Sequence, residues 1–238
     1  MDSQHNTATL RQPISRVAVT NAFLRSVYNW MAFGLCITAI LAYVLTYTPL
    51  NELLLTPAAM PVFWVCAIAE IGLVFFLSFR INKLAAGTAA TLFLVYSALN
   101  GVTLSFLLGL FTAGSVVQAF LATTGMFAFM SLYGMFTKRD LAGIGSFCVM
   151  GVFGLILAML INLFFQSSRM DMLISFAGVA IFLGLTAYDT QLLKTMGESV
   201  PRDDVQAVRR ATIMGALRLY LDFINLFIML LRLMGDRR

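Results

Sequence analysis

Charged residues are scarce in this sequence of 238 residues. Asp, Glu, Lys and Arg make up 11% of the chain and hydrophobic residues 60%, whereas soluble domains average about 25% and about 45–50%. A soluble fold of this length cannot bury so much apolar surface, so the surplus is expected to face lipid. The composition excludes a soluble domain and predicts an all-α integral membrane protein.

Histidine and cysteine are also rare, which limits the possible chemistry. His5, the only histidine, lies in the polar N-terminal stretch, so neither Ser–His hydrolysis nor a zinc site is expected. Cys36, Cys66 and Cys148 each lie inside an apolar run without metal-ligand spacing, and we interpret them as small core residues. No lysine lies inside an apolar run, which excludes a retinal pump, and no cofactor motif is present. No cofactor is therefore expected.

Seven apolar runs are long enough to cross a bilayer, which takes about 20 residues each. Charges and turn residues separate them, and the expected spans are residues 27–47, 58–79, 84–110, 116–136, 141–165, 172–193 and 212–234. Residues 1–26 are polar and lack the apolar core of a cleavable signal. We therefore expect a cytoplasmic N-terminal segment at 1–26 and one transmembrane domain of seven helices at 27–238, with the lipid bilayer as its surroundings.

Lysine and arginine gather on one side of the expected bundle, as the positive-inside rule requires of a cytoplasmic N-terminus. The cytoplasmic segments then contain Arg11, Arg16, Arg25, Arg80, Lys83, Lys138, Arg139, Lys194, Arg202, Arg209 and Arg210, and the outer loops only Arg169. Seven spans put the C-terminus outside, but Arg232, Arg237 and Arg238 oppose the rule there, so its side stays open. The net charge of +5 lies in these short loops, and no nucleic-acid partner is expected.

Small residues recur at every fourth position of the third span. Ser97, Gly101, Ser105 and Gly109 form this strip, which either lets another helix approach closely or reflects how common such residues are in membrane helices.

Four ionisable residues fall inside the expected spans: Glu70, Asp189, Arg218 and Asp222. Each charge at a helix centre costs roughly 2.5–3.5 kcal/mol on insertion scales, so these groups should face the bundle interior. In "RLYLDFINLF", Arg218, Asp222 and Asn225 share one helix face. One interpretation is a structural ion pair between Arg218 and Asp222, one turn apart. That interpretation leaves Asp189 and Glu70 without an obvious partner.

The other interpretation is a functional pair. If Asp189 and Asp222 lie close together, both cannot be ionised in a low dielectric, so they should share one proton. Protonated, they would hold the last two helices together. Deprotonated, they would repel and offer oxygen ligands for a transient Ca²⁺. They meet only if the sixth span extends beyond residue 193 or the seventh starts after residue 212.

Three segments resemble the Bax inhibitor-1 family over nearly the whole chain. They are "TAYDTQ" (186–191), "LRLYLDFINLFIMLLRL" (217–233) and "FRINKL" (79–84). The resemblance implies a central seventh helix wrapped by the other six. It also implies, for a bacterial inner-membrane protein, a pH-sensitive calcium leak channel with Ca²⁺ as the permeant ion. Its pH sensor would be Asp189 and Asp222, closing the pore from the cytoplasmic side.

The resemblance also suggests roles for the other polar residues. Arg80 would latch onto Asp189, and Glu70 would line the path. Arg218 and Asn225 would then belong to the polar network that orients Asp222.

Two other functions stay open. Members of the family are also thought to restrain other membrane proteins, including quality-control proteases, so the chain is either a channel or a non-conducting regulator. An intramembrane aspartyl protease would use two aspartates as well. Asp222, however, follows Tyr220-Leu221 rather than the Gly-x-Gly expected there, and no enzyme is predicted.

Overall fold

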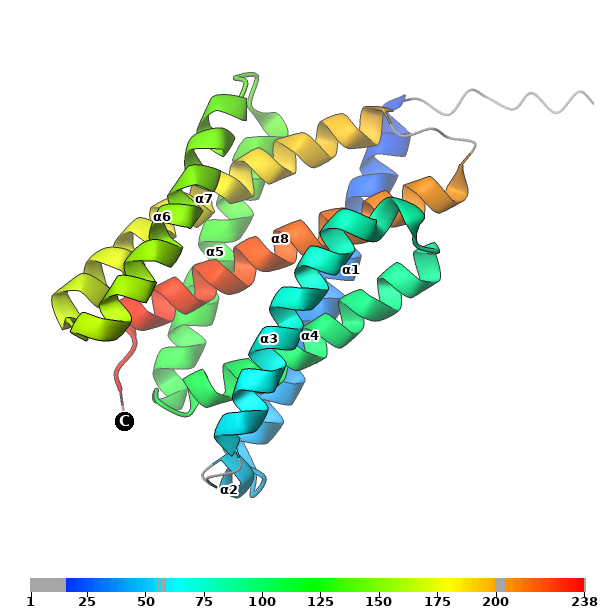
Figure 1. Cartoon of the computed structure of the whole chain (residues 1–238). Helices are drawn as coiled ribbons and strands as arrows, with labels where there is room; N and C mark the ends of the chain where they lie inside the picture. The colour runs from blue at the N-terminus through cyan, green and yellow to red at the C-terminus, as the bar shows by residue number, and fades with distance from the viewer. Residues whose placement is uncertain (1–15, 55, 57–58, 200–203, 238) are drawn as a thin grey trace, which may run out of the picture.

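The computed structural model describes residues 16–54, 56, 59–199 and 204–237. Its helices are α1 (Arg16–Tyr47), α2 (Asn51–Leu54), α3 (Ala59–Arg80), η1 (Ile81–Lys83), α4 (Ala86–Leu108), α5 (Ala113–Phe136), α6 (Ala142–Phe165), α7 (Ser168–Ser199) and α8 (Val205–Met234) (Figure 1). Seven of them, all but α2 and η1, are long and apolar enough to cross a membrane. The prediction of an all-α protein with seven membrane spans is confirmed.

At one end of the bundle, three helices extend beyond the predicted span boundaries. This is the end where α1 and α8 begin and α7 finishes. α1 begins at Arg16 rather than at residue 27, α7 continues to Ser199, and α8 already begins at Val205. The added turns are packed, since Phe23 is buried and lies against Gly197. A helix does not stop at its first charged residue, because long side chains reach water while the backbone hydrogen bonds continue. The predicted polar segment is therefore partly helical, and residues 1–15 lie outside the described residues.

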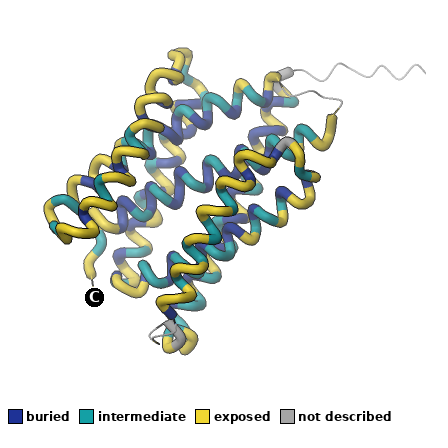
Figure 2. The backbone as a smooth tube through the Cα atoms, in the orientation of Figure 1, coloured by how far each residue is buried: buried dark blue, intermediate teal, exposed yellow. Residues whose placement is uncertain are grey.

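The last helix, α8, is the most buried span. In its apolar window 72% of the residues are buried, and no other span exceeds 44%. It packs against α1, α4, α5 and α7, whereas α3 packs mainly on α4 and α6 on α7. Figure 2 shows dark blue along α8 and yellow on the outward faces of α3 and α6. That all six helices wrap α8 stays a prediction.

Small residues set the distance between α1 and α4. A methyl group at Gly101 would lie 2.9 Å from the Thr38 carbonyl oxygen. Thr38 donates a hydrogen bond to the Ser97 carbonyl (2.7 Å), and Thr46 donates one to the Ser105 carbonyl (3.2 Å). The strip predicted in the third span is thus a helix contact, except at Gly109, where an added methyl group would meet only its own helix.

Gly134 brings α5 against α7 just as closely. A methyl group there would collide with the backbone of Ala187. We expect Gly134→Ala to destabilise the protein by about 1–3 kcal/mol, the usual cost of overpacking, and to lower the midpoint of thermal unfolding in detergent. Gly125→Ala, on the same helix with nothing within 4 Å of the added carbon, is the matched control. Equal midpoints for the two variants would contradict the close approach.

Candidate functional site

Asp189 and Arg218 form an ion pair between α7 and α8. Arg218 Nη1 lies 3.4 Å from Asp189 Oδ1, and Asp189 is buried while Arg218 is half-exposed. The helix packing sets this register, because Leu193 of α7 lies against Gly215 of α8. Arg218 therefore pairs with a residue of another helix. The structural interpretation of the sequence, which paired Arg218 with Asp222 within α8, is wrong on this point.

Asp222 lies one turn further along α8 than Arg218, away from the connection between α7 and α8. It is 4% exposed, and its Oδ2 atom is buried without a hydrogen-bond partner. Its carboxyl group lies within electrostatic reach of both Asp189 and Arg218. The structure shows no hydrogen bond between the carboxyl groups of Asp189 and Asp222, so direct proton sharing stays a prediction. Their proximity depends on α7 running past residue 193, which it does.

A buried serine that the sequence reasoning missed lies on α5, between residues that contact α7 and α8. Ser131 Oγ on α5 is buried without a hydrogen-bond partner. Ser131 lies one turn from Phe127, whose ring packs 5.4 Å from that of Phe223, and nearly one turn from Gly134, which touches Ala187. It therefore faces the junction of α5 with α7 and α8. Unpartnered buried polar atoms are rare in folded proteins, so this hydroxyl group calls for an explanation, such as a bound water or ion.

A second polar network joins four helices through Glu70 on α3. Thr103 donates to Glu70 Oε1 (2.8 Å) and Asn100 Nδ2 donates to Oε2 (3.2 Å). The Tyr220 hydroxyl on α8 donates to Asn100 Oδ1 (3.1 Å) and lies 2.6 Å from the Thr38 hydroxyl on α1. Among the described residues, Glu70 forms hydrogen bonds but no ion pair, so Asn100 and Thr103 are the partners that the sequence did not reveal. Sequence patterns could not pair Thr38 with Tyr220, because contacts between distant helices leave no periodic signal.

Glu70 borders a cavity of about 380 Å³ between α3, α4 and α8. Asn225 and Arg232 line the same cavity. Asn225 therefore borders the same cavity as Glu70, one turn along α8 from Asp222. The three residues predicted to share one helix face therefore belong to two neighbouring sites. Arg218 and Asp222 lie near Asp189, and Asn225 borders the cavity with Glu70.

One stripe of α8 is left partly uncovered. Most residues of α8 between 211 and 232 are buried. The residues that are not buried follow one another at spacings of three and four, in alternation. This stripe consists of Ala211, Met214, Arg218, Leu221, Asn225, Ile228 and Arg232. It repeats with helical periodicity, and its polar members recur every seven residues along the helix. In the view of Figure 1, α8 is visible between α3 and α6.

Arg80 does not act as a latch in this structure. It is the last residue of α3, is exposed, and forms no ion pair with any described residue. Arg218 occupies the position next to Asp189 instead. The latch was inferred from the resemblance, and its formation in another state of the protein stays a prediction.

The transient Ca²⁺ site expected at Asp189 and Asp222 stays a prediction. Among the described residues no group of three or more His, Cys, Asp or Glu side chains can hold a metal ion. Calcium takes six to eight oxygen ligands, so an ion at Asp189 and Asp222 would keep most of its water.

The chain matches known proteins along most of its length. Residues 20–238 match the family model described as inhibitor of apoptosis-promoting Bax1. The inner membrane protein YbhL of Escherichia coli (strain K12) is 46% identical over 217 residues, covering 91% of this chain and 92% of the relative. A protein of Borreliella burgdorferi is 42% identical over 229 residues, covering 96% and 98%. A protein of Deinococcus radiodurans is 42% identical over 218 residues, covering 90% of each.

Proposed function

Since the chain belongs to the Bax inhibitor-1 family, we propose that it is a pH-sensitive calcium leak channel gated by Asp189 and Asp222. The observation that carries the proposal is the buried, unpartnered Oδ2 of Asp222 beside the Asp189–Arg218 ion pair. The relative from E. coli is named an inner membrane protein, and we extend that location to this chain. We assign the chain no catalytic role.

The closed state follows from charge balance. The cation of Arg218 neutralises Asp189, and Asp222, without a hydrogen bond to Oδ2, carries the proton, because an isolated buried carboxylate is costly. The charged or titratable groups that face Asp222 among the described residues are Asp189 on α7, Arg218 on α8 and the Cys148 thiol on α6. With one cation for two carboxyl groups, one proton completes the balance, and α7 and α8 stay packed.

Loss of that proton opens the path. Two carboxylates then face one arginine, so α7 and α8 repel each other near Asp222 and present oxygen atoms to a divalent cation. On the other side of the gate, the cavity at Glu70 supplies a third carboxylate close to Asn225. A cation would pass from one carboxylate site to the next. Raising the pH removes the proton, so the leak should increase with pH.

The test is the leak itself. Purified protein in liposomes loaded with a calcium dye should admit Ca²⁺ several times faster in alkaline than in acidic buffer, and protein-free liposomes should show no such difference. A leak without pH dependence would contradict gating by Asp189 and Asp222 but would leave the channel itself in place. No leak at any pH would favour the non-conducting regulator, which holds other membrane proteins without passing ions.

A further inference from the structure

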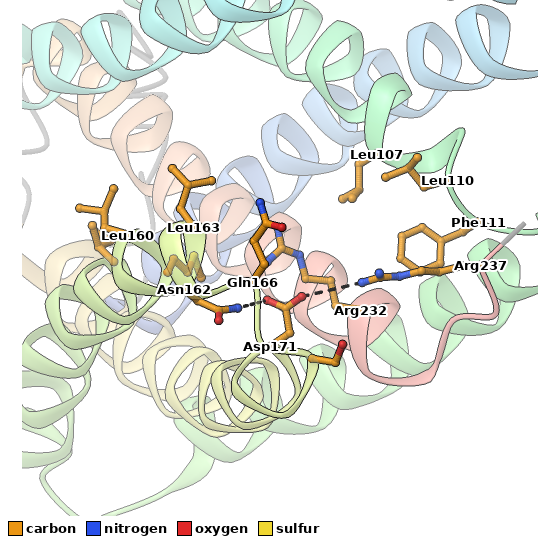
Figure 3. Close-up of a pocket in the computed structure, with 13 residues that line it drawn as sticks. Leu107, Leu110, Phe111, Leu160, Asn162, Leu163, Gln166, Asp171, Arg232 and Arg237 are labelled. Carbon is orange, nitrogen blue, oxygen red and sulfur yellow. Dashed lines mark hydrogen bonds and ion pairs between the residues drawn. The ribbon is translucent and has the colours of Figure 1, made fainter.

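A second cavity, of about 670 Å³, lies at the end of the bundle where α8 terminates. α4, α6, α7, α8 and the C-terminal tail contribute residues to it (Figure 3). The channel proposal makes no use of this cavity. It combines a charged side with an apolar side.

The charged side contains two arginines and one aspartate. Arg237 lies 3.8 Å from Asp171, which also accepts a hydrogen bond from Asn162 Nδ2 (2.9 Å). Arg232 is exposed and forms no ion pair or hydrogen bond with any described residue. Figure 3 shows Arg232, Arg237 and Asp171 converging on the cavity. The two arginines carry two positive charges and Asp171 one negative charge, so the described charged residues of this cavity have a net charge of +1.

The tail that carries Arg237 is fixed in place. The Thr112 backbone N–H donates to the Asp236 carbonyl (3.1 Å), and the Asp236 N–H donates to Ser115 Oγ (2.9 Å). Ser115 lies in the first turn of α5. Arg237 is thus held beside Asp171 by backbone contacts as well as by its own ion pair. The fold therefore places the backbone of Arg237 beside the cavity, and its exposed guanidinium group lies within ion-pair distance of Asp171.

The apolar side faces the membrane. Ile156, Leu160 and Leu163 of α6 line the cavity and are 48%, 53% and 66% exposed. They lie on a membrane span, so the cavity opens sideways to hydrocarbon as well as to water. An apolar wall next to two arginines at the end of a span matches the shape of a phospholipid, with its chain in the bilayer and its phosphate at the interface.

We propose that this cavity binds one anionic phospholipid from the leaflet at the C-terminal end of α8. Its phosphate contacts Arg232 and Arg237, and one acyl chain lies along the α6 wall. A phosphodiester with an uncharged head group carries one negative charge, equal and opposite to the charge of the cavity. A choline head group would add a cation next to the two arginines. The site also gives a function to two arginines that would oppose the positive-inside rule if the N-terminus is cytoplasmic.

The test uses native mass spectrometry of the full chain released from nanodiscs that contain phosphatidylglycerol and phosphatidylcholine in equal amounts. Phosphatidylglycerol should be retained preferentially, and Arg232→Gln with Arg237→Gln should lower its retention about tenfold, through loss of charge-assisted contacts. Arg169→Gln is the matched control, because Arg169 is exposed at the start of α7 and does not line the cavity. Equal retention of both lipids, or no effect of the double substitution, would overturn the proposal.

A second variant separates a lipid from free phosphate. Leu160→Trp fills the apolar wall without changing charge, so it should also lower phosphatidylglycerol retention. Excess inorganic phosphate should not displace the lipid. Displacement by phosphate together with normal retention in Leu160→Trp would show an anion site without a lipid, and would also overturn the proposal. This variant leaves both arginines in place, so the result does not depend on folding of the double variant.

Discussion

Asp222→Asn is expected to keep the calcium leak at its acidic, closed level at every pH. Asparagine has nearly the shape of a protonated aspartic acid but cannot ionise. The second carboxylate that opens the gate therefore never forms, and the Asp189–Arg218 ion pair stays balanced. The ratio of leak in alkaline to leak in acidic buffer should fall to about one, because only the charged form repels Asp189. The measurement is dye-reported Ca²⁺ entry into liposomes.

The control for this result is Asp236→Asn. Asp236 is an exposed carboxyl group just beyond the end of α8, where a lost charge should leave the pH dependence unchanged. If Asp222→Asn shows the same pH-dependent leak as the wild type, Asp222 is not part of the gate, although the protein can still be a channel. Thermal unfolding of both variants should be measured as well, because an unchanged midpoint separates a lost pH response from a lost fold.

The membrane spans could be predicted because their signal is local. Each helix must be apolar over about 20 residues to cross the bilayer, and this requirement appears directly in the sequence. The ends could not be predicted, since packing such as that of Phe23 on Gly197 extends helices beyond the charged residues that were taken as boundaries. Hydropathy reports the surroundings of a helix, whereas its length also depends on its neighbours.

The polar residues of the site were identified, but most of their partners were not. A buried charge in a membrane span is costly, so Glu70, Asp189, Arg218 and Asp222 stood out in the sequence. Their partners depend on helix register, which is set by contacts such as Leu193 on Gly215. Sequence periodicity pairs residues within one helix, and it offered Asp222 as the partner of Arg218. The structure pairs Arg218 with Asp189 across two helices.

Ser131 and Tyr220 were missed for a related reason. A hydroxyl group is common in membrane helices and carries no charge penalty, so neither residue stood out. Ser131 does continue a buried stripe of α5 that also contains Ser115, Ala119, Thr123 and Phe127. That spacing predicts a packed face but cannot show that the serine lacks a hydrogen-bond partner.

Arg218→Gln is expected to move the pH of half-maximal leak upward by about one to three units. In the wild type, one cation stabilises the ionised carboxyl groups of this pair. Without it, Asp189 and Asp222 face each other with no compensating charge among the groups described around them, so they hold protons to a higher pH. The gate then stays closed further into the alkaline range. The same liposome assay, run as a pH series, gives the midpoint.

Two arginine variants show whether charge or shape is responsible. Arg218→Lys keeps the cation and should leave the midpoint close to that of the wild type. Arg210→Gln removes another arginine of α8, which contacts the surface carboxylate of Asp204 (3.8 Å) and the Leu84 carbonyl (3.5 Å). This variant should also leave the midpoint unchanged. A midpoint that moves downward in Arg218→Gln would mean that the arginine itself blocks cation entry rather than balancing the aspartates. In that case the gate would depend on the half-exposed guanidinium of Arg218, and the protonation of Asp222 would be secondary.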